Sequence, residues 1–333
     1  MTTPSDQAAI ARLHETLDLQ RRAYLKEPDP SLATRLELLG RIPGMMMANA
    51  RRIAAALNDD YGYHNELTAY LFDVLNVAER AQYAAAHLEQ WMRRDERELE
   101  PQLYGSSKAY IEFQPKGVIG NMPAWNFPVD LSVGPLVEML AAGNRVIIKP
   151  SEQTPAVGQL LAEMLGDTFA REQVSVVNGG LDLARHFSTM NTAVGKEIMR
   201  NAAQNLVPVT LELGGRNPTV FTEDAVTRDN VRIMLGSKLT KNGQLCIAVN
   251  HVLVPETARD KFIGLVREVI ESAVGDYTTS PQVGCAVINP RQMARVQSYL
   301  DDARERDAQG VIEIGSPAAA ANPRRKPGSM VIK

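Results

Sequence analysis

The segment from Thr210 to Ala248 opens with Leu211-Glu212-Leu213-Gly214-Gly215 and closes with Asn242-Gly243-Gln244-Leu245-Cys246-Ile247-Ala248. Together these two quoted motifs contain one acid, Glu212, and one thiol, Cys246. Cys246 lies in a small, glycine-containing turn that follows a helix-like stretch, and such a turn is typical of an accessible thiol. Glu212 falls in a β-rich run, Val207 to Leu213. We therefore expect a strand that ends at the glycine pair, with a carboxylate at its end.

Each of these residues has a simpler interpretation when it is taken alone. A lone cysteine in an intracellular protein is most often a small buried hydrophobe. A glutamate before a glycine pair is usually a turn residue. Two further segments favour the functional interpretation, and they read Pro123-Ala124-Trp125-Asn126-Phe127-Pro128 and Ile148-Lys149-Pro150-Ser151-Glu152.

In this order the four segments resemble the aldehyde dehydrogenase superfamily, most closely its coniferyl-aldehyde dehydrogenase-like branch. The resemblance covers the chain from about Arg35 to about Val331. It implies an α/β fold with a Rossmann-type parallel sheet in a cofactor domain, a second, incomplete α/β catalytic domain and a β-hairpin oligomerisation arm. The implied limits are 1–102 and 118–213 for the N-terminal helices and dinucleotide-binding domain, 103–117 for the hairpin and 214–333 for the catalytic domain.

Hydrophobic periodicity supports this order of elements. Residues 5–98 have helical spacing with a break at Pro43-Gly44, and Leu103 to Gly117 has the period of two of a β-hairpin. Strand and helix patterns then alternate, which predicts a parallel sheet. The segments are 117–121, 131–142, 145–149, 156–169 and 174–178. A second α/β unit is predicted from strands at 218–221 and 251–254 and helices at 225–239, 258–274 and 291–306.

The resemblance assigns the chemistry to three residues. Cys246 is the nucleophile, because a thiolate adduct of an aldehyde is a good hydride donor and then becomes a thioester. The side-chain amide of Asn126 and the backbone N–H of Cys246 receive the oxyanion. Glu212 is the base that activates water for hydrolysis. Taken alone, Asn126 would be interpreted as a helix N-cap or turn residue, and Cys285 is expected to be structural.

The resemblance also assigns a cofactor site. Lys149 and Glu152 are expected to hold the hydroxyls of the adenine-side ribose. The carboxylate of Glu152 should repel a 2′-phosphate, so the sequence favours NAD, with NADP as the alternative. Further cofactor-binding positions implied by the resemblance are Trp125, Ser151, Thr192, Gly195 and Gly214.

The chain departs from the family pattern at two places. After Met190 a strand and a Thr-Gly pair of the family's diphosphate-binding motif have no counterpart, although Thr192 and Gly195 match the end of that motif. Family members also continue well beyond Lys333. We therefore expect the sequence to be shortened at both places, and a polypeptide that ends at Lys333 not to turn over aldehydes.

Composition excludes several other classes of function. The 36 basic and 39 acidic residues are interspersed and give a net charge of -3, so the sequence predicts no nucleic-acid partner. No apolar run approaches the ~18 residues of a membrane span, and the N-terminus lacks the pattern of a secretory signal. Two distant cysteines indicate neither a disulfide framework nor a zinc site, and they predict a reducing, cytoplasmic location.

The resemblance implies a small hydrophobic or aromatic (coniferyl-type) aldehyde as the substrate and, for a complete polypeptide, other copies of the chain as partners in a dimer or tetramer. Two alternatives remain. One is a non-catalytic fragment or assembly subunit of the same family. The other is a cysteine acyl hydrolase, which would need a histidine base. His251 is the histidine nearest to Cys246 in sequence, on a predicted strand where a structural role is expected.

Overall fold

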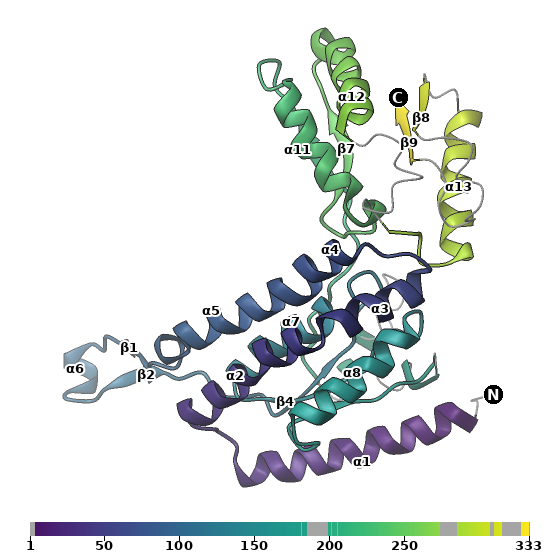
Figure 1. Ribbon diagram of the computed structural model, residues 1–333. Coiled ribbons are helices and arrows are strands. Elements are labelled where there is room, and N and C mark those ends of the chain that lie inside the picture. The colour runs from purple at the N-terminus through teal and green to yellow at the C-terminus, as the bar shows by residue number, and fades with distance from the viewer. Residues whose placement is uncertain are drawn as a thin grey trace. The chain divides into compact units, whose positions relative to one another are not determined.

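The computed structural model describes residues 4–180, 182–184, 199–200, 202–204, 206–273, 285–306, 310–314 and 328–332 (Figure 1). Contacts between residues divide the chain into two compact units. The first contains Met1–Ala56 and Ala69–Thr189, and the second contains Leu57–Thr68 and Met190–Lys333. The predicted limits of a hairpin at 103–117 and a catalytic domain from residue 214 stay predictions as domain boundaries.

The first unit contains the predicted parallel sheet. Its strands β3 (Val118–Asn121), β4 (Arg145–Ile148) and β5 (Val174–Val176) pair in that order, and both pairs are parallel. Helix α7 (Asp130–Ala141) connects the first two strands, and α8 (Pro155–Thr168) connects the second two. All four residues of β4 are buried, as expected for a central strand covered on both faces.

Helices cover both faces of this sheet. Helix α1 (Pro4–Lys26) lies on one face, where Ala9 and Leu13 pack with Ile147 of β4 (Figure 1). Helices α7 and α8 follow two crossovers in the same direction along the sheet, and right-handed crossovers place both of them on the other face. The alternation of strand and helix patterns therefore predicted this layer correctly.

A helical layer packs beyond α7 and includes α2 (Leu32–Ala48) and α5 (Asn76–Trp91). Helix α3 (Ala50–Tyr61) follows α2 in the chain. The predicted break at Pro43-Gly44 is wrong, because α2 continues through Pro43 and ends at Ala48, with Asn49 as its C-cap. Leu39, Ile42 and Met46 are fully buried on this helix. We infer that their burial offsets the one hydrogen bond that the proline removes. Two short segments precede α5, namely α4 (Glu66–Thr68) and the π-helix Ala69–Leu75.

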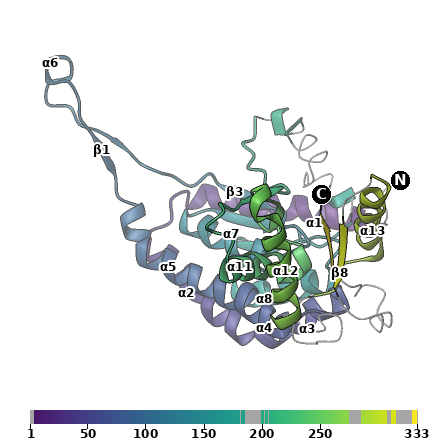
Figure 2. The same ribbon diagram turned by 90° about the horizontal axis from the view of Figure 1, so that it is seen from above.

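A β-hairpin leaves the rest of the first unit, but it begins earlier than the sequence pattern predicts. Strand β1 (Asp95–Arg97) pairs antiparallel with β2 (Ala109–Ile111), and the short helix α6 (Pro101–Tyr104) forms the tip. Figure 2 shows the hairpin extending away from the helices that carry it. Period two was visible only in the second arm, because β1 has three charged, exposed residues and no apolar alternation.

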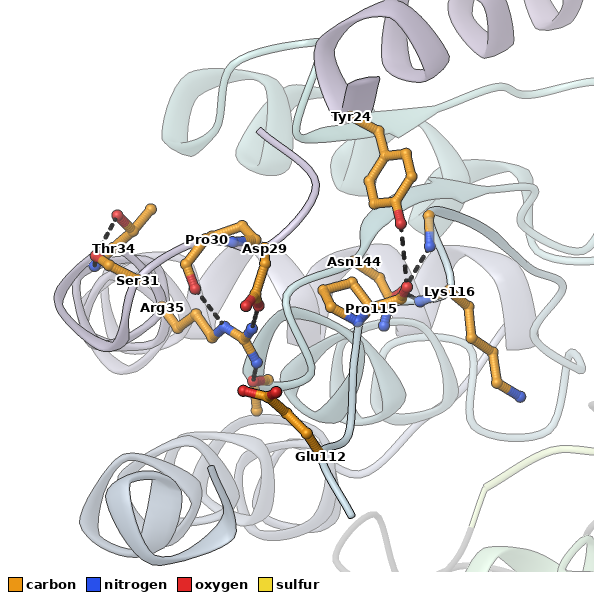
Figure 3. A network of polar contacts seen from close by, with 12 residues as sticks. Tyr24, Asp29, Pro30, Ser31, Thr34, Arg35, Glu112, Pro115, Lys116 and Asn144 are labelled. Atoms are coloured by element: carbon orange, nitrogen blue, oxygen red, sulfur yellow. Dashed lines mark hydrogen bonds and ion pairs between the residues drawn. The ribbon is translucent and has the colours of Figure 1, made fainter. Parts of the chain in front are cut away.

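The chain that returns from the hairpin is fixed by polar contacts (Figure 3). Tyr24 Oη donates to the carbonyl of Pro115 at 3.2 Å, and Asn144 Oδ1 accepts from the backbone N–H of Lys116 at 2.7 Å. The buried guanidinium of Arg35 donates to the carbonyls of Pro30 and Ala141 and to Asp29. Gly143 has φ +79°, and a Cβ there would lie 2.8 Å from both Arg35 Cζ and Pro115 Cγ, so glycine is required.

The second unit repeats the strand, helix, strand order. Strands β6 (Asn217–Val220) and β7 (Val249–Leu253) are parallel and are connected through α11 (Arg228–Leu239) and the turn Thr240–Gly243. The 3₁₀ turn Glu256–Ala258 and α12 (Arg259–Ala273) follow β7. Figure 1 shows α11 and α12 beside β7. Their common core is formed by Phe221, Val226, Val231, Met234, Leu235, Ala258, Phe262, Val266, Val269 and Ile270.

Three further elements complete the described part of the second unit. Helix α13 (Pro290–Glu305) begins at Asn289, whose side chain accepts a hydrogen bond from the backbone N–H of Gln292 at 2.9 Å. Strands β8 (Gly310–Ile314) and β9 (Gly328–Ile332) form an antiparallel pair. The strands and helices predicted after residue 214 are thus present within a few residues of their expected positions.

Candidate active site

Two of the predicted site segments leave the same edge of the parallel sheet. Asn121 and Ile148 are paired at the carboxyl ends of β3 and β4, and the backbone N–H of Lys149 donates to the carbonyl of Asn121 at 2.9 Å. Residues 122–127 and 149–152 therefore begin side by side. Ligands in open α/β folds bind beyond this edge.

The Lys149–Glu152 pair lies directly after β4. Lys149 is 1% exposed, and its Nζ lies 2.9 Å from Oε2 of Glu152, whose side chain is 36% exposed. A buried ammonium is costly without a partner, and the carboxylate provides one while its outer surface remains open to solvent. Ser151 is half-buried, and its Oγ accepts a hydrogen bond from the backbone N–H of Gln153 at 3.2 Å, so this hydroxyl also shapes the turn.

Trp125 and Asn126 lie in the turn between β3 and α7, and both are half-buried. Asn126 is not the cap of α7, because the helix begins at Asp130 with Val129 at the N-cap position and no side-chain capping hydrogen bond. Instead, Oδ1 of the buried Asp73 accepts from the backbone N–H of Asp130 at 3.3 Å. Phe72 packs edge to face on Phe127 with ring centroids 6.3 Å apart. The π-helix therefore supports the chain on both sides of Pro128.

In the second unit, the segment that carries Glu212 differs from its predicted form. Residues 206–216 contain no strand, and all of them are exposed except the half-buried Leu211. The prediction of a strand at Val207–Leu213 is therefore wrong. Apolar alternation alone does not make a strand, because strand formation also requires a neighbour that pairs with the backbone. Glu212 itself is exposed on this irregular segment.

The glycine pair after Glu212 approaches the turn that carries Cys246. A Cβ at Gly215 would collide with the carbonyl oxygen of Cys246, whereas a Cβ at Gly214 would have no heavy atom within 4 Å. Asn217, at the start of β6, donates from Nδ2 to the carbonyl of Cys246 at 2.7 Å and to that of Ala248 at 3.0 Å. The acid-bearing and thiol-bearing segments are thus held together at the backbone level.

The turn before Cys246 has an uncommon backbone. Lys241, Asn242 and Gly243 have φ values of 48°, 57° and 72°, so three consecutive residues lie in the left-handed region. Such conformations cost about 1–2 kcal/mol per non-glycine residue. Cys246 is exposed just beyond this turn, whereas Cys285 is buried.

A buried cation anchors the same turn. Lys241 is 1% exposed, and its Nζ lies 5.1 Å from the centroid of the Tyr61 ring. His64 packs edge to face on Tyr61 at 5.3 Å and pairs with Cys285 through an isolated β-bridge. Burial, together with the positive charge of Lys241, lowers the pKa of His64 from 6.5 to about 3, so this imidazole is neutral. His251 is exposed on β7.

The structure therefore brings the predicted residues together in two groups. One group, in the second unit, comprises Glu212, Gly214 and Cys246. The other group, in the first unit, comprises Trp125, Asn126, Lys149, Ser151 and Glu152. Thr192 and Gly195 lie outside the described residues. In the described ranges, no cluster of histidine, cysteine, aspartate and glutamate side chains could hold a metal ion. No described helix is both long enough and apolar enough to cross a membrane.

Sequence reasoning missed three polar residues around the thiol, namely Asn217, Lys241 and Gln244. A signal existed for Gln244, because a glutamine between a glycine and two apolar residues has no obvious surface role. Asn217 and Lys241 carried no comparable signal. Their contacts depend on chain segments that are distant in sequence or on a backbone conformation that no pattern predicts.

The chain is similar to known proteins in sequence and in fold. The sequence profile described as "Aldehyde dehydrogenase family" matches residues 7–328. A "Probable coniferyl aldehyde dehydrogenase" of Pseudomonas aeruginosa is 36% identical over 311 residues, covering 91% of this chain and 65% of that protein. A protein of the same description from Caulobacter vibrioides is 34% identical over 342 residues, covering 98% of this chain and 70% of that protein. The chain thus spans about two thirds of the length of these relatives.

A solved structure has the same fold. The aldehyde dehydrogenase of Mycobacterium tuberculosis, complexed with NAD+, superposes with a TM-score of 0.82 at 22% identity, covering 97% of this chain and 68% of that one. The fold, the profile match over most of the sequence and the identity to the two curated relatives agree with one another. The chain therefore belongs to the aldehyde dehydrogenase family.

Proposed function

We propose that this protein oxidises an aldehyde to a carboxylic acid with NAD as the hydride acceptor, and that the reaction proceeds through a thioester on Cys246. One observation carries the proposal. The exposed thiol lies in a turn whose backbone is held against the glycine pair that follows Glu212. The proposed nucleophile, Cys246, and the carboxylate of Glu212 therefore lie on two adjoining chain segments, which resemble the family's cysteine and glutamate motifs.

In the first step, the Cys246 thiolate attacks the aldehyde carbon and forms a hemithioacetal. The exposed position of the thiol supports this role, because a nucleophile must be reachable by its substrate. Loss of hydride from the same carbon then gives a thioester. Bound NAD supplies the chemistry of this step by accepting the hydride and its electron pair.

Asn126 is assigned to the oxyanion. Its position in a turn at the carboxyl end of β3, where it does not cap α7, supports this role. One prearranged donor of this kind contributes about 3 kcal/mol of barrier lowering. The backbone N–H of Cys246 is proposed as the second donor.

Glu212 is assigned to the final step. Its exposed carboxylate takes a proton from water, the oxygen of that water attacks the thioester carbonyl, and the Cys246 thiolate leaves. The carboxylic acid is released and the thiol is restored for another turnover.

The residues beside β4 fit the ribose of a dinucleotide. Glu152 is held by the buried ammonium of Lys149, and its partly exposed carboxylate can accept hydrogen bonds from two ribose hydroxyls. The same negative charge disfavours a 2′-phosphate, which is the reason for proposing NAD over NADP. The Mycobacterium tuberculosis relative was solved with NAD+, which agrees with this choice.

The substrate class and the assembly follow from separate observations. The descriptions of the two curated relatives support an aromatic, coniferyl-type aldehyde. The hairpin exposes Leu103, Tyr104, Tyr110 and Ile111, which supports a role in binding another copy of the chain. A thiol nucleophile must stay reduced, so we propose the cytoplasm as the location.

The test is the formation of NADH from NAD and coniferyl aldehyde, followed by absorbance. Because the chain shortened at both places is expected not to turn over aldehydes, residues 1–333 are assayed beside a version that is restored after Met190 and after Lys333. Cys246→Ser should abolish NADH formation, whereas Cys285→Ser should retain it. Equal activity of the Cys246→Ser variant and the unmodified protein would refute the proposal.

A further inference from the structure

Gln244 lies two residues before the proposed nucleophile and makes an unusual number of polar contacts. Its Nε2 lies 3.0 Å from the carbonyl of Lys241, 3.1 Å from the carbonyl of Ala286 and 3.3 Å from Sγ of Cys285. Its Oε1 accepts from the backbone N–H of Ile288 at 3.1 Å. One amide side chain thereby joins its own turn to a segment more than forty residues later in the chain.

The segment that receives these contacts is well supported. Cys285, Ala286 and Ile288 are buried, and the backbone N–H of Ala286 donates to the carbonyl of Tyr63 at 3.0 Å. Gln244 therefore connects the turn to buried structure and not to a surface loop.

The turn requires such an anchor. Lys241 and Asn242 are both left-handed without being glycine, and strained residues of this kind persist only when the surroundings over-determine them. The side chain of Gln244 also donates a hydrogen bond to the carbonyl of Lys241, so it bonds to the strained turn itself as well as to the 285–288 segment. Asn217 fixes the other side of Cys246 through the carbonyls of residues 246 and 248.

We propose that Gln244 is a positioning residue for Cys246. Its amide holds the left-handed turn against the 285–288 segment, so that the thiol and the backbone N–H of Cys246 meet a bound carbonyl in a fixed geometry. This inference rests on the proposed role of Cys246 as nucleophile. It adds a residue whose contribution is exerted through the turn and not through contact with substrate.

Two thiol reactions separate positioning from accessibility. Alkylation of Cys246 by iodoacetamide needs only a reachable thiolate. Acylation by p-nitrophenyl acetate passes through an oxyanion and forms a thioester as p-nitrophenolate leaves, so it also needs the thiol and the oxyanion donors in register. The ratio of the two rates therefore measures how well the turn is positioned, without aldehyde or cofactor.

The first variant is Gln244→Met, which keeps the length of the side chain and removes its hydrogen bonds. Misplacement by about 1 Å can cost ~100-fold in rate, so the ratio of acylation to alkylation should fall by roughly 30-fold or more while alkylation stays within about threefold. Gln297→Met on α13, which removes a surface hydrogen bond to Asp301, is the matched control and should leave the ratio unchanged.

The second variant is Gln244→Glu, which keeps the acceptor for Ile288 but places a carboxylate against two carbonyl oxygens. At pH 8 it should be at least as impaired as Gln244→Met, and its ratio relative to the unmodified protein should recover as the pH falls and the carboxyl gains a proton. A circular dichroism melt establishes that each variant is folded.

An unchanged ratio in both folded variants would overturn the proposal, as would an equal fall in alkylation and acylation. The proposed dehydrogenase function is judged separately. If the protein fails to form NADH while the ratio still responds to Gln244, the function is wrong and the positioning role stands.

Discussion

Gly215→Ala should displace the turn that carries the nucleophile. The new Cβ would lie about 0.8 Å inside the 3.0 Å limit below which a Cβ essentially never approaches another atom, and the atom it meets is the backbone carbonyl oxygen of Cys246. A backbone atom cannot rotate away as the end of a side chain can. The two segments must therefore separate by nearly 1 Å, with Asn217 also in the path at 2.9 Å.

A displacement of this size can lower the rate by ~100-fold, which corresponds to about 2.7 kcal/mol of activation free energy. Gly264→Ala on α12 provides the control, because a Cβ there meets no atom within 4 Å. Neither Gly215 nor Gly264 has a positive φ, so alanine is compatible with both backbones. The control adds the same methyl group at a position that has no assigned role in the site.

The assay is NADH formation from an aromatic aldehyde, with kcat and KM measured for both variants and the unmodified protein. The kcat of Gly215→Ala should fall, and that of Gly264→Ala should stay within about threefold of the value for the unmodified protein. A Gly215→Ala variant as active as Gly264→Ala would show that the approach of the two segments does not set the position of the thiol.

Four further predictions follow from the same structure. Limiting iodoacetamide should label Cys246 before Cys285, because only the former is exposed; peptide mapping that finds the reverse order would contradict the assignment. Glu212→Gln should give a burst of NADH without steady turnover, since the thioester forms but water is not activated, and unchanged steady-state rates would place the base elsewhere. Glu152→Gln should raise kcat/KM for NADP relative to NAD, because the charge that repels a 2′-phosphate is removed; a constant ratio would contradict that role. The pKa of His64 is lowered to about 3 in the folded protein, against 6.5 when exposed. The unfolded chain therefore binds the extra proton at a higher pH than the folded protein does, and the free energy of unfolding falls as the pH drops from about 6.5 toward 3. The loss should approach ~1.4 kcal/mol per pH unit in urea unfolding, and a His64→Gln variant that shows the same slope would exclude this group.

The sequence predicted the parallel sheet of the first unit because its strands and helices alternate with clear changes of period. Val146–Ile148 is a short apolar run that lies between Arg145, which follows a glycine turn, and Lys149, and only a buried strand fits that length. The hairpin was located less accurately. Its first arm, Asp95–Arg97, has no apolar residue and becomes a strand only because Ala109–Ile111 pairs with it.

The motifs of the candidate site could be predicted from the sequence, but the residues that hold those motifs in place could not. The assignment of Cys246, Glu212 and Lys149 rests on their distinctive sequence neighbours, and their roles stay predictions. The contacts of Asn217 with the carbonyl of Cys246 depend on the approach of β6 to a turn about thirty residues later, and no local pattern encodes that approach. At Val207–Leu213 a local pattern predicted a strand that is absent. The residues there are of types common in strands, but they form no strand in the described structure.

The division of α3 between the two units has a consequence for synthesis on the ribosome. The helix begins in the first unit, but Leu57–Thr68 belong to the second, where His64 pairs with Cys285 about 220 residues later. At roughly 5–20 residues per second, translation needs roughly 10–45 s to span that interval. Throughout it, the nascent chain carries the end of α3 without the segment that pairs with His64. The thiol-bearing turn, whose Lys241 packs on the ring of Tyr61, can acquire its final shape only after the 285–288 segment has left the exit tunnel.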